Sequence, residues 1–502
     1  MKTKQIIVVL LGMLITAQFA GAQEQDQYQK WLKKENDKYQ QFKDARDREF
    51  SDFLKQEWIK FQLHQGLVPD LKPKPVEVPV YTPPDTAKPT PEIKDQKIIE
   101  KIEVPQPPPP PDKIEKIELP QPAPPPSPER IEQPVPPKAE NQVKVSFFGV
   151  PLSINYDKKF KLSLMDEINQ ESISRYWAQL SQTDYDGLVK QLQEIETRLH
   201  LNDWGYGVLL HDVGKVLYPS SDNQQTLLVW FLLAKSGYLA KVGYDKSRIY
   251  LLLPTDKVLY NTLYFTINEQ KYYLVNFTSG ATELSELYTY DGSYPGAEQL
   301  ITMEIAQPLN IGNTIIKKNL KFDYNGQNYT LPVEYSRGTV DFFQDYPQTD
   351  LEVYFSAAAS PAATNSILEA LRPILIGRTE ADAVNLLLRF TQTAFTYQTD
   401  DEQFGREKFL FPDETIYYPA SDCEDRSIFF TNLVKELLGL EVIGLDYPGH
   451  IATAVKFSDN LPGDAILFHN QRYLICDPTY VNADLGICMP QFKNVEPKVI
   501  QF

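Results

Sequence analysis

Three residues near the C-terminal end of the chain could together supply a nucleophile, a base and an orienting carboxylate. Cys423 follows Tyr-Pro-Ala-Ser-Asp, His450 follows Pro-Gly, and Asp477 precedes Pro-Thr. A cysteine thiolate is the nucleophile that acyl transfer needs, and a histidine held by an aspartate can take its proton. A lone cysteine is more often a small buried apolar residue. The case for chemistry therefore rests on the three residues together and on their order.

The stretch that follows the cysteine has the pattern of an amphipathic helix. Residues 424–438 place apolar side chains on one broad face, and Gly439 is a suitable stop. At a helix N-terminus, the dipole and the free N–H groups should lower the pKa of Cys423. Arg426 adds a positive charge, and a nearby imidazolium would have to supply the rest. Three carboxylates oppose the effect, those of Asp422, Glu424 and Asp425.

The histidine and the aspartate each belong to a strand-like run. His450 begins a run that extends to Phe457, and Asp477 ends a run that starts at Arg472. If the two strands lie antiparallel and adjacent, the end of one falls opposite the beginning of the other. Asp477 would then orient the imidazole, and His450 would draw the proton from Cys423.

This order and context resembles the transglutaminase-like superfamily of cysteine enzymes, over residues 360–485. The resemblance implies an active site of Cys423, His450 and Asp477. It also implies an α+β, papain-like fold, in which the helix that carries the Cys packs on an antiparallel sheet that carries the His and the Asp. The chain departs from the family in having Ser-Asp before the Cys, where many relatives have a glycine, and His-Ile-Ala where His-Ala-Trp is common.

A second copy of the pattern lies upstream, with its three chemical residues replaced. Two segments carry the match, residues 218–223 with 418–423 and residues 271–278 with 472–479. The nucleophile, base and orienter positions become Asn223, Arg248 and Asn276. Asn cannot replace a thiolate, and Arg cannot release a proton near neutral pH. We therefore expect a duplicated fold whose first copy is a pseudoenzyme domain, with chance similarity as the alternative.

The N-terminal residues have the features of an export signal. Two lysines precede an apolar run, Ile6 to Ile15, and Ala-Gly-Ala precedes Gln23. The apolar run is shorter than a membrane span needs. We expect cleavage after residue 22 and a periplasmic or secreted protein without a transmembrane segment, with an uncleaved anchor as the alternative.

A predicted helix and a Pro-rich linker follow the signal. Aromatic residues recur with a step of eleven, which is close to three helical turns and keeps them on one face. They are Tyr28, Tyr39, Phe50 and Phe61, and in parallel Trp31, Phe42 and Phe53. The stripe would dock on its own protein or on itself, or it would form a coiled coil or bind a protein partner. Residues 66–140 hold over half of the 39 prolines, and we favour a passive spacer over a Pro-rich ligand.

These patterns divide the chain into six segments. They are a signal peptide at 1–22, an aromatic-striped helix at 23–65, a Pro-rich linker at 66–140, a degenerate transglutaminase-like domain at 141–285, a β-rich module at 286–360 and a transglutaminase-like catalytic domain at 361–502. The β-rich module rests on Asn325-Gly326 between two strand-like runs, which predicts a hairpin.

Composition excludes some partners and cofactors. The formal net charge of −17 argues against nucleic acid, which needs clustered Lys and Arg. The chain has no P-loop and no zinc-type Cys/His cluster, and the resemblance implies no redox cofactor, so we expect neither a cofactor nor a metal. Three cysteines do not make a disulfide scaffold. Cys476 and Cys488 could pair with each other, which would leave Cys423 free.

These observations favour an exported cysteine protease or amidase that cleaves amide bonds of a protein or peptide through an acyl-enzyme. Hydrolysis is favoured over cross-linking because water is the default acceptor. The alternative is a non-catalytic envelope adaptor that binds protein or cell-wall peptide, and it would tolerate Ala at position 423. A third hypothesis is a zymogen whose N-terminal segments mask the site until they are cleaved.

Overall fold

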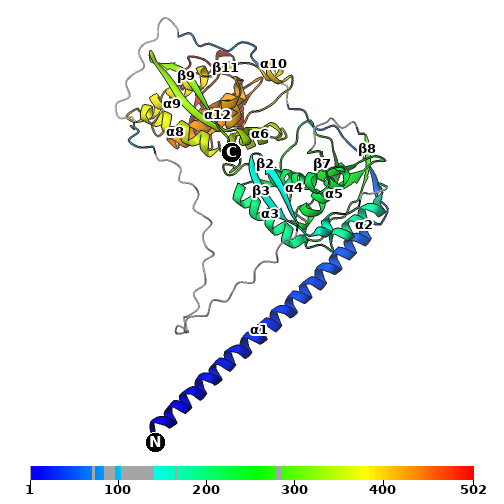
Figure 1. Cartoon of the computed structure of the whole chain (residues 1–502). Helices are drawn as coiled ribbons and strands as arrows, with labels where there is room; N and C mark the ends of the chain where they lie inside the picture. The colour runs from blue at the N-terminus through cyan, green and yellow to red at the C-terminus, as the bar shows by residue number, and fades with distance from the viewer. Residues whose placement is uncertain (1, 70–73, 84–96, 103–140, 164–166, 278–283) are drawn as a thin grey trace.

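The computed structural model describes residues 2–69, 74–83, 97–102, 141–163, 167–277 and 284–502. It is a mixed α+β protein in which most strands form antiparallel sheets. The side chains of residues 1–27, which include the predicted signal peptide, and the second half of the predicted linker lie outside this description. Within it, no helix has the length and apolarity that crossing a membrane requires. Figure 1 shows two bodies and a long helix, α1 (Lys2–Leu54), that projects away from them.

The first body, here the first unit, combines a hairpin, four helices and a sheet. The hairpin consists of β2 (Gln142–Phe147) and β3 (Val150–Asn155). The helices are α2 (Gln170–Leu180), α3 (Tyr185–Leu199), α4 (Asp203–Leu217) and α5 (Asp222–Lys235). Its sheet contains β1 (Ile59–Gln62), β4 (Lys241–Tyr244), β5 (Ile249–Leu253), β6 (Tyr264–Ile267), β7 (Gln270–Val275) and β8 (Glu286–Thr289), in the order β1-β8-β4-β5-β7-β6.

The second unit repeats this combination. Its hairpin consists of β9 (Ile315–Tyr324) and β10 (Gln327–Ser336). Its helices are α6 (Arg337–Gln344), α7 (Leu351–Ser356), α8 (Pro361–Leu375), α9 (Glu380–Thr393), α10 (Asp400–Phe404), α11 (Pro412–Tyr417) and α12 (Cys423–Leu438). Its sheet contains β13 (Val442–Tyr447), β14 (His450–Val455), β15 (Ala465–Phe468), β16 (Gln471–Cys476) and β17 (Lys498–Ile500), in the order β15-β16-β14-β13-β17. A parallel pair, β11 (Thr396–Tyr397) with β12 (Ala420–Ser421), precedes α12.

The two units share one arrangement of elements. After α5 the strands lie in the order β6-β7-β5-β4-β8, and after α12 they lie in the order β15-β16-β14-β13-β17, all antiparallel. The hairpins correspond as well, because β2 and β3 contact α4 and α3 as β9 and β10 contact α9 and α8. The two units therefore share a hairpin, a pair of helices that contact it, a core helix and five antiparallel strands, and β1 adds a sixth strand to the sheet of the first unit.

Helix α12 is the core of the second unit, and its bounds match the prediction. It ends at Gly439, which adopts φ +64° and donates its N–H to the carbonyl of Lys435, a conformation that favours glycine. The sequence predicts that α12 is buried along one apolar face, but the structure buries it on several faces. Twelve of the sixteen residues of α12 are buried, because α7, α9, α11 and the sheet strand β14 cover it from several sides.

The predicted helix at residues 23–65 is wrong at its C-terminal end. Helix α1 stops at Leu54, and residues 59–62 form β1, an edge strand that pairs antiparallel with β8. Phe61, the last member of the aromatic stripe, contacts the ring of Phe265 in this sheet, with centroids 5.0 Å apart. The run from Ile59 to Leu63 alternates apolar and polar residues, a strand pattern that we overlooked because of the eleven-residue spacing.

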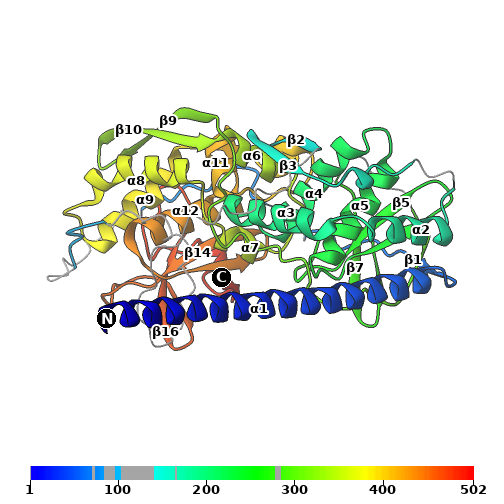
Figure 2. The same cartoon turned by 60° about the horizontal axis from the view of Figure 1, so that its bottom comes forward.

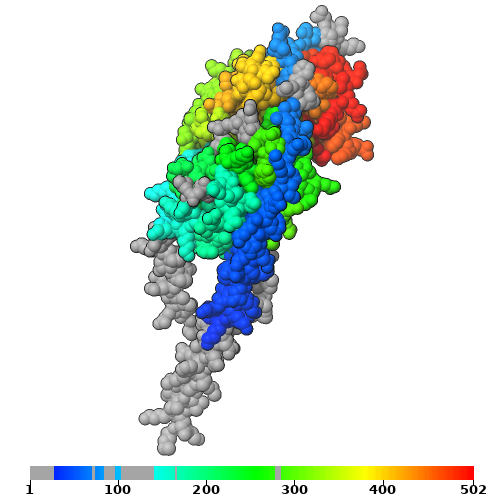
Figure 3. Space-filling view, turned by 90° about the vertical axis from the view of Figure 1, so that its right-hand side faces the viewer, coloured from blue at the N-terminus to red at the C-terminus, as the bar shows by residue number. Residues whose placement is uncertain are grey.

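The aromatic stripe has two environments along α1. Phe50 and Leu54 are buried in the first unit, and the ammonium of Lys235 pairs with Asp47. Figure 3 shows α1 in dark blue, running along the first unit and projecting beyond it. The stripe residues on the projecting part are all exposed, namely Tyr28, Trp31, Tyr39 and Phe42. The C-terminal end of α1 therefore docks on its own protein, as one of the two hypotheses predicts.

The expected β-rich module at residues 286–360 is wrong as an all-β stretch. Its first strand, β8, belongs to the sheet of the first unit, and its helices α6 and α7 follow the hairpin β9–β10. The hairpin itself is confirmed, with Asn325 and Gly326 at φ +51° and +76° in its turn. Helices α8 and α9 cover the hairpin, so its apolar side chains join the core of the second unit.

The described residues of the linker are not a passive spacer. Residues 79–81 and 480–481 exchange backbone hydrogen bonds, from Tyr81 N–H to Val481 O at 2.7 Å and from Val481 N–H to Pro79 O at 2.8 Å. Further along, Ile99 exchanges backbone hydrogen bonds with residues 377–378, and Ile102 is buried in the core of the second unit. This part of the chain is thus held on the second unit.

The burial of α1 at Phe50 predicts a stability difference between two members of the stripe. Phe50→Ala should lower the free energy of unfolding of the first unit by about 3–5 kcal/mol, because a large cavity remains in a packed core. Phe42→Ala should change it by less than about 0.5 kcal/mol, since Phe42 is 59% exposed and Phe50 only 4%. Urea unfolding of both variants measures this, and equal, small effects would contradict the docking of α1.

Candidate active site

The structure brings the three sequence-predicted residues to one end of the second unit. Cys423 is the first residue of α12, His450 is the first residue of β14, and Asp477 directly follows β16. Strands β14 and β16 are antiparallel neighbours, with Thr453 opposite Cys476. Cys423 and His450 line the same cavity, which has a volume of about 500 Å³.

His450 is held by its aspartate, as the sequence predicts. Its Nε2 lies 2.8 Å from Oδ2 of Asp477. The other carboxylate oxygen, Oδ1, accepts the backbone N–H groups of Thr479 and Tyr480 at 2.9 and 3.1 Å. The imidazole also stacks on the ring of Phe492, with centroids 5.4 Å apart and the planes 4° from parallel. With Nε2 taken by the carboxylate, Nδ1 has no hydrogen-bond partner among the described residues.

A tight turn places His450 at the start of its strand. Tyr447 pairs with His450 across a two-residue loop of Pro448 and Gly449, and Gly449 adopts φ +75°. A side chain is strained in that conformation, so glycine suits this turn. Gly449 also lines the cavity.

Cys423 lies in an environment that opposes ionisation, contrary to the prediction. The side chain is 1% exposed, and its thiol donates to Oε2 of Glu424 at 3.2 Å. Burial, followed by the charges of Glu424 and Asp422, raises the pKa of the Cys423 thiol well above its ordinary value. Lys74 and a hydrogen bond from the backbone N–H of Ile451 act in the other direction. The helix dipole is a fraction of one charge, which two adjacent carboxylates and burial outweigh.

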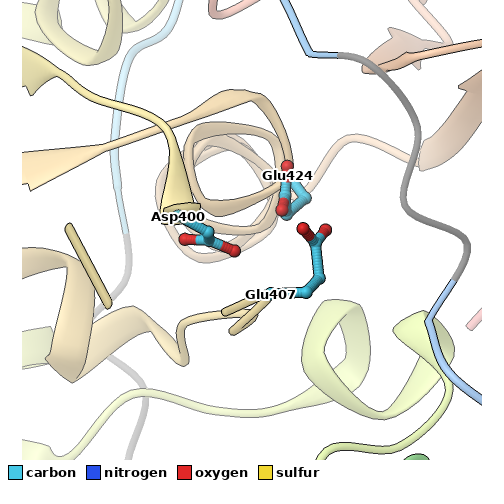
Figure 4. A group of neighbouring side chains, drawn as sticks. All are labelled: Asp400, Glu407 and Glu424. Carbon is cyan, nitrogen blue, oxygen red and sulfur yellow. The ribbon is translucent and has the colours of Figure 1, made fainter. Parts of the chain in front are cut away.

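A cluster of buried carboxylates surrounds the N-terminus of α12. Figure 4 shows the carboxylates of Asp400, Glu407 and Glu424 converging, and Asp422 completes the group. The ammonium of Lys74 lies among all four, at 3.5 Å from Asp400, 2.8 Å from Glu407 and 2.9 Å from Asp422, and in contact with Glu424. The oxygens of Asp400, Glu407 and Glu424 are close enough to hold a hard cation, and here Lys74 supplies the positive charge.

The pKa values of the cluster show how one ammonium is shared. Burial and the charges of Glu424 and Asp425 raise the pKa of Asp400 to about 9. Burial also raises the pKa of Asp422 well above its usual range. Burial would raise the pKa of Glu424 as well, but the ammonium of Lys74 outweighs it and lowers the value. Glu424 is therefore the member that stays ionised, next to the thiol.

Two buried residues hold the parts of the site together: Gln392, which the sequence did not indicate, and Arg426, which it indicated only as a charge beside Cys423. Gln392 on α9 donates through Nε2 to the backbone carbonyls of Asp477, Tyr480 and Ala483, at 3.1, 2.9 and 3.0 Å. Arg426 on α12 donates to the carbonyls of Gln392 and Phe395, at 3.2 and 2.9 Å. Arg426 thus links the cysteine helix to α9, and Gln392 links α9 to the Asp477 loop. Single Gln and Arg residues carry no sequence motif that would reveal this.

The pairing suggested for the other two cysteines is not formed. All three cysteines lie in the described part of the chain and are free, buried thiols. Cys476 packs against the α12 side of the sheet, whereas Cys488 packs with Tyr447 and Ile475 on the opposite side. The sheet separates their sulfurs.

The strand registers place the replaced residues of the upstream copy at corresponding positions. Asn276 directly follows β7 as Asp477 follows β16. Leu251 pairs with Val275 as Thr453 pairs with Cys476, and Arg248 precedes Leu251 by the three residues that separate His450 from Thr453.

The first residue of the replaced set has a corresponding contact too. Oδ1 of Asn223 accepts the backbone N–H of Ile249 at 2.9 Å. In the second unit, the N–H of Ile451 hydrogen-bonds to the sulfur of Cys423. Ile249 follows Arg248 as Ile451 follows His450, so Asn223 occupies the position of the cysteine.

Comparisons of the chain with protein-family models, with curated proteins and with solved structures find no match. The case for a function therefore rests on the geometry of the site and on the resemblance that its residues carry.

The carboxylate beside the thiol predicts a shift in the reactivity of Cys423. Glu424→Gln removes a negative charge that raises the thiol pKa, so the midpoint of the pH dependence of Cys423 alkylation should move to lower pH. The measurement uses iodoacetamide and a background in which Cys476 and Cys488 are Ser. Glu402→Gln, at an exposed acidic residue of α10, is the matched control. A midpoint that stays in place or rises would show that Glu424 does not hold the proton on the sulfur.

Proposed function

We propose that this chain is an exported, transglutaminase-like cysteine enzyme that acts on amide bonds of a protein or peptide. Its triad is Cys423, His450 and Asp477. One observation supports this most: His450, paired with Asp477 at 2.8 Å, lines the same cavity as Cys423, and its Nδ1 has no hydrogen-bond partner among the described residues. A base held in this way can accept the proton of the thiol.

The proposed reaction begins with transfer of the thiol proton to Nδ1 of His450. The sulfur then attacks the amide carbonyl, and the backbone N–H of Cys423, at the first position of α12, stabilises the oxyanion. His450 returns its proton to the leaving amine, which departs and leaves a thioester on Cys423. Water, deprotonated by His450, attacks the thioester and releases a carboxylic acid and the free thiol. Asp477 orients the imidazole and stabilises its charged form.

The shared strand order of the two units supports a duplicated transglutaminase-like fold. In this proposal the first unit is a pseudoenzyme domain. An amide at Asn223 cannot act as a thiolate, and a guanidinium at Arg248 cannot accept a proton from a nucleophile. The basic start and the short apolar run of residues 1–22 support export to the periplasm or to the outside of the cell.

A non-catalytic envelope adaptor is the alternative function. The burial of Cys423 and the raised pKa of its thiol favour it. In this account the exposed aromatic residues on the projecting part of α1 bind a protein partner, and the second unit binds a protein or cell-wall peptide without cleaving it. The two functions differ in whether Cys423 forms a covalent bond with an acyl group.

Acetylation of Cys423 by p-nitrophenyl acetate tests the proposal. The sulfur would take the acetyl group and release p-nitrophenolate, so intact mass and absorbance both report the step. In a background with Cys476 and Cys488 changed to Ser, His450→Ala should slow acetylation by about 10²–10⁴-fold through loss of the general base. Asp477→Asn, which keeps the shape of the side chain, should give an intermediate rate.

The control is His469→Ala, because His469 is an exposed histidine in the turn between β15 and β16. Its acetylation rate should equal that of the parent. If the parent, His450→Ala and His469→Ala proteins acetylate Cys423 at the same rate, the enzyme proposal is wrong and the adaptor is favoured.

A further inference from the structure

A segment of the predicted linker lies beside the candidate active site. Residues 74–83, here called the strap, begin at Lys74 in the carboxylate cluster. The carbonyl of Pro75 accepts the hydroxyl of Tyr397 at 2.8 Å. Farther along, Val80 forms a parallel bridge with Val481, four residues after Asp477. The strap thus runs from the N-terminus of the cysteine helix to the loop that holds the aspartate.

The ammonium of Lys74 is the part of the strap that the site binds most completely. Its side chain is 9% exposed and pairs with four carboxylates, none of them more than 9% exposed. Burial lowers the pKa of Lys74, but the charges of Glu424 and Asp422 outweigh it and raise the value far above the ordinary one. The pocket is therefore built for a cation and holds this one in its charged form.

The carboxylates and their cation come from different parts of the chain. Asp422 and Glu424 belong to the start of α12, and Asp400 and Glu407 to the segment that begins with α10. Lys74 comes from a strap that contributes no strand to the sheet of the second unit among the described residues. Oδ1 of Asp422, in a side chain that is fully buried, has no hydrogen-bond partner in the described structure. The pocket thus has more acceptors than the strap fills.

Both ends of the strap use contacts that a separate peptide could reproduce. A backbone pairing at Val481 is independent of side chains, as in other cases where a peptide adds to an exposed strand or loop. The ammonium contacts are specific for a side chain with a primary amine at its end. Lys74, Pro69, Cys423 and His450 line one cavity, so a peptide in place of the strap would lie beside the thiol.

We infer that the strap is a tethered ligand of a peptide-binding site, and that this site takes an extended peptide whose lysine-like ammonium enters the pocket of Asp400, Glu407, Asp422 and Glu424. Lys74 occupies the pocket until such a peptide replaces it. The exchange substitutes one ammonium for another, so the buried carboxylates keep a positive partner throughout. That the incoming peptide is also a substrate rests on the proposed function, whereas its binding does not.

The experiment measures peptide binding in the full chain with Cys423→Ala, so that no acyl transfer can occur. The probes are two fluorescent peptides with an acetylated N-terminus: the strap sequence of residues 74–83, and the same sequence with Met in place of its lysine. Fluorescence anisotropy gives the dissociation constants. Against the Lys74→Met protein, the lysine peptide should bind at least tenfold more tightly than the methionine peptide. The protein that retains Lys74 should bind the lysine peptide at least tenfold more weakly than the Lys74→Met protein does.

Lys97→Met is the matched control, because Lys97 is 69% exposed and pairs only peripherally with Glu380. It should bind the peptides as the protein that retains Lys74 does. A second variant, Tyr81→Pro, removes the N–H that donates to Val481 and leaves every carboxylate and Lys74 in place, so it keeps the test valid if Lys74→Met does not fold. Tyr81→Pro should tighten binding of the lysine peptide several-fold over its parent.

Equal binding of the two peptides by Lys74→Met, or no gain from either variant over its parent, would overturn the inference and leave Lys74 as a structural ion-pair partner. Failure of the acetylation experiment is distinguishable from this result. Peptide binding is read out without the thiol, and acetylation of Cys423 is read out without a peptide.

Discussion

The N-terminus of α12 buries a cluster of carboxylates whose ionised member, Glu424, needs a cation, and Lys74 provides that cation from a segment 350 residues away. Removing one partner from a buried ion pair typically costs about 3–5 kcal/mol, because the remaining charge is left without compensation. With four carboxylates around one ammonium, this constraint ties the strap to the cysteine helix. Burial and the charges of Glu424 and Asp422 hold the proton on Cys423, and the ammonium of Lys74 acts in the other direction. The position of Lys74 and the chemical state of the thiol are therefore coupled through Glu424.

The sheet of the second unit provides the complementary half of the site. The antiparallel register of β14 and β16 sets His450 beside Asp477, and Gln392 and Arg426 tie that loop and the cysteine helix to α9. The first unit has the same helix-and-sheet order with Asn223, Arg248 and Asn276 at the three positions. A fold that tolerates such replacements owes its stability to packing and register. Packing and register alone therefore do not require Cys423, His450 and Asp477 at these positions in the second unit.

Local patterns revealed the features that depend on neighbouring residues. The start of α12 at Cys423, its end at Gly439, the strand beginning at His450 and the turn at Asn325-Gly326 all follow from short-range rules, and the structure confirms them. The features that we did not predict depend on contacts between residues that lie far apart in the sequence. Lys74 stands in a Pro-rich stretch that resembles a spacer, and nothing near it indicates four carboxylates from residues 400–424. The raised pKa of Cys423 was missed because burial, which the sequence does not show, outweighs the helix dipole.

The central claim is that His450 takes the proton of Cys423. The most direct measurement is the rate of Cys423 alkylation by iodoacetamide as a function of pH, in a protein with Cys476 and Cys488 changed to Ser and in the same protein with His450→Ala. We predict that His450→Ala slows alkylation at every pH at which the imidazole can act as a base. Equal rates with and without His450 would contradict this claim.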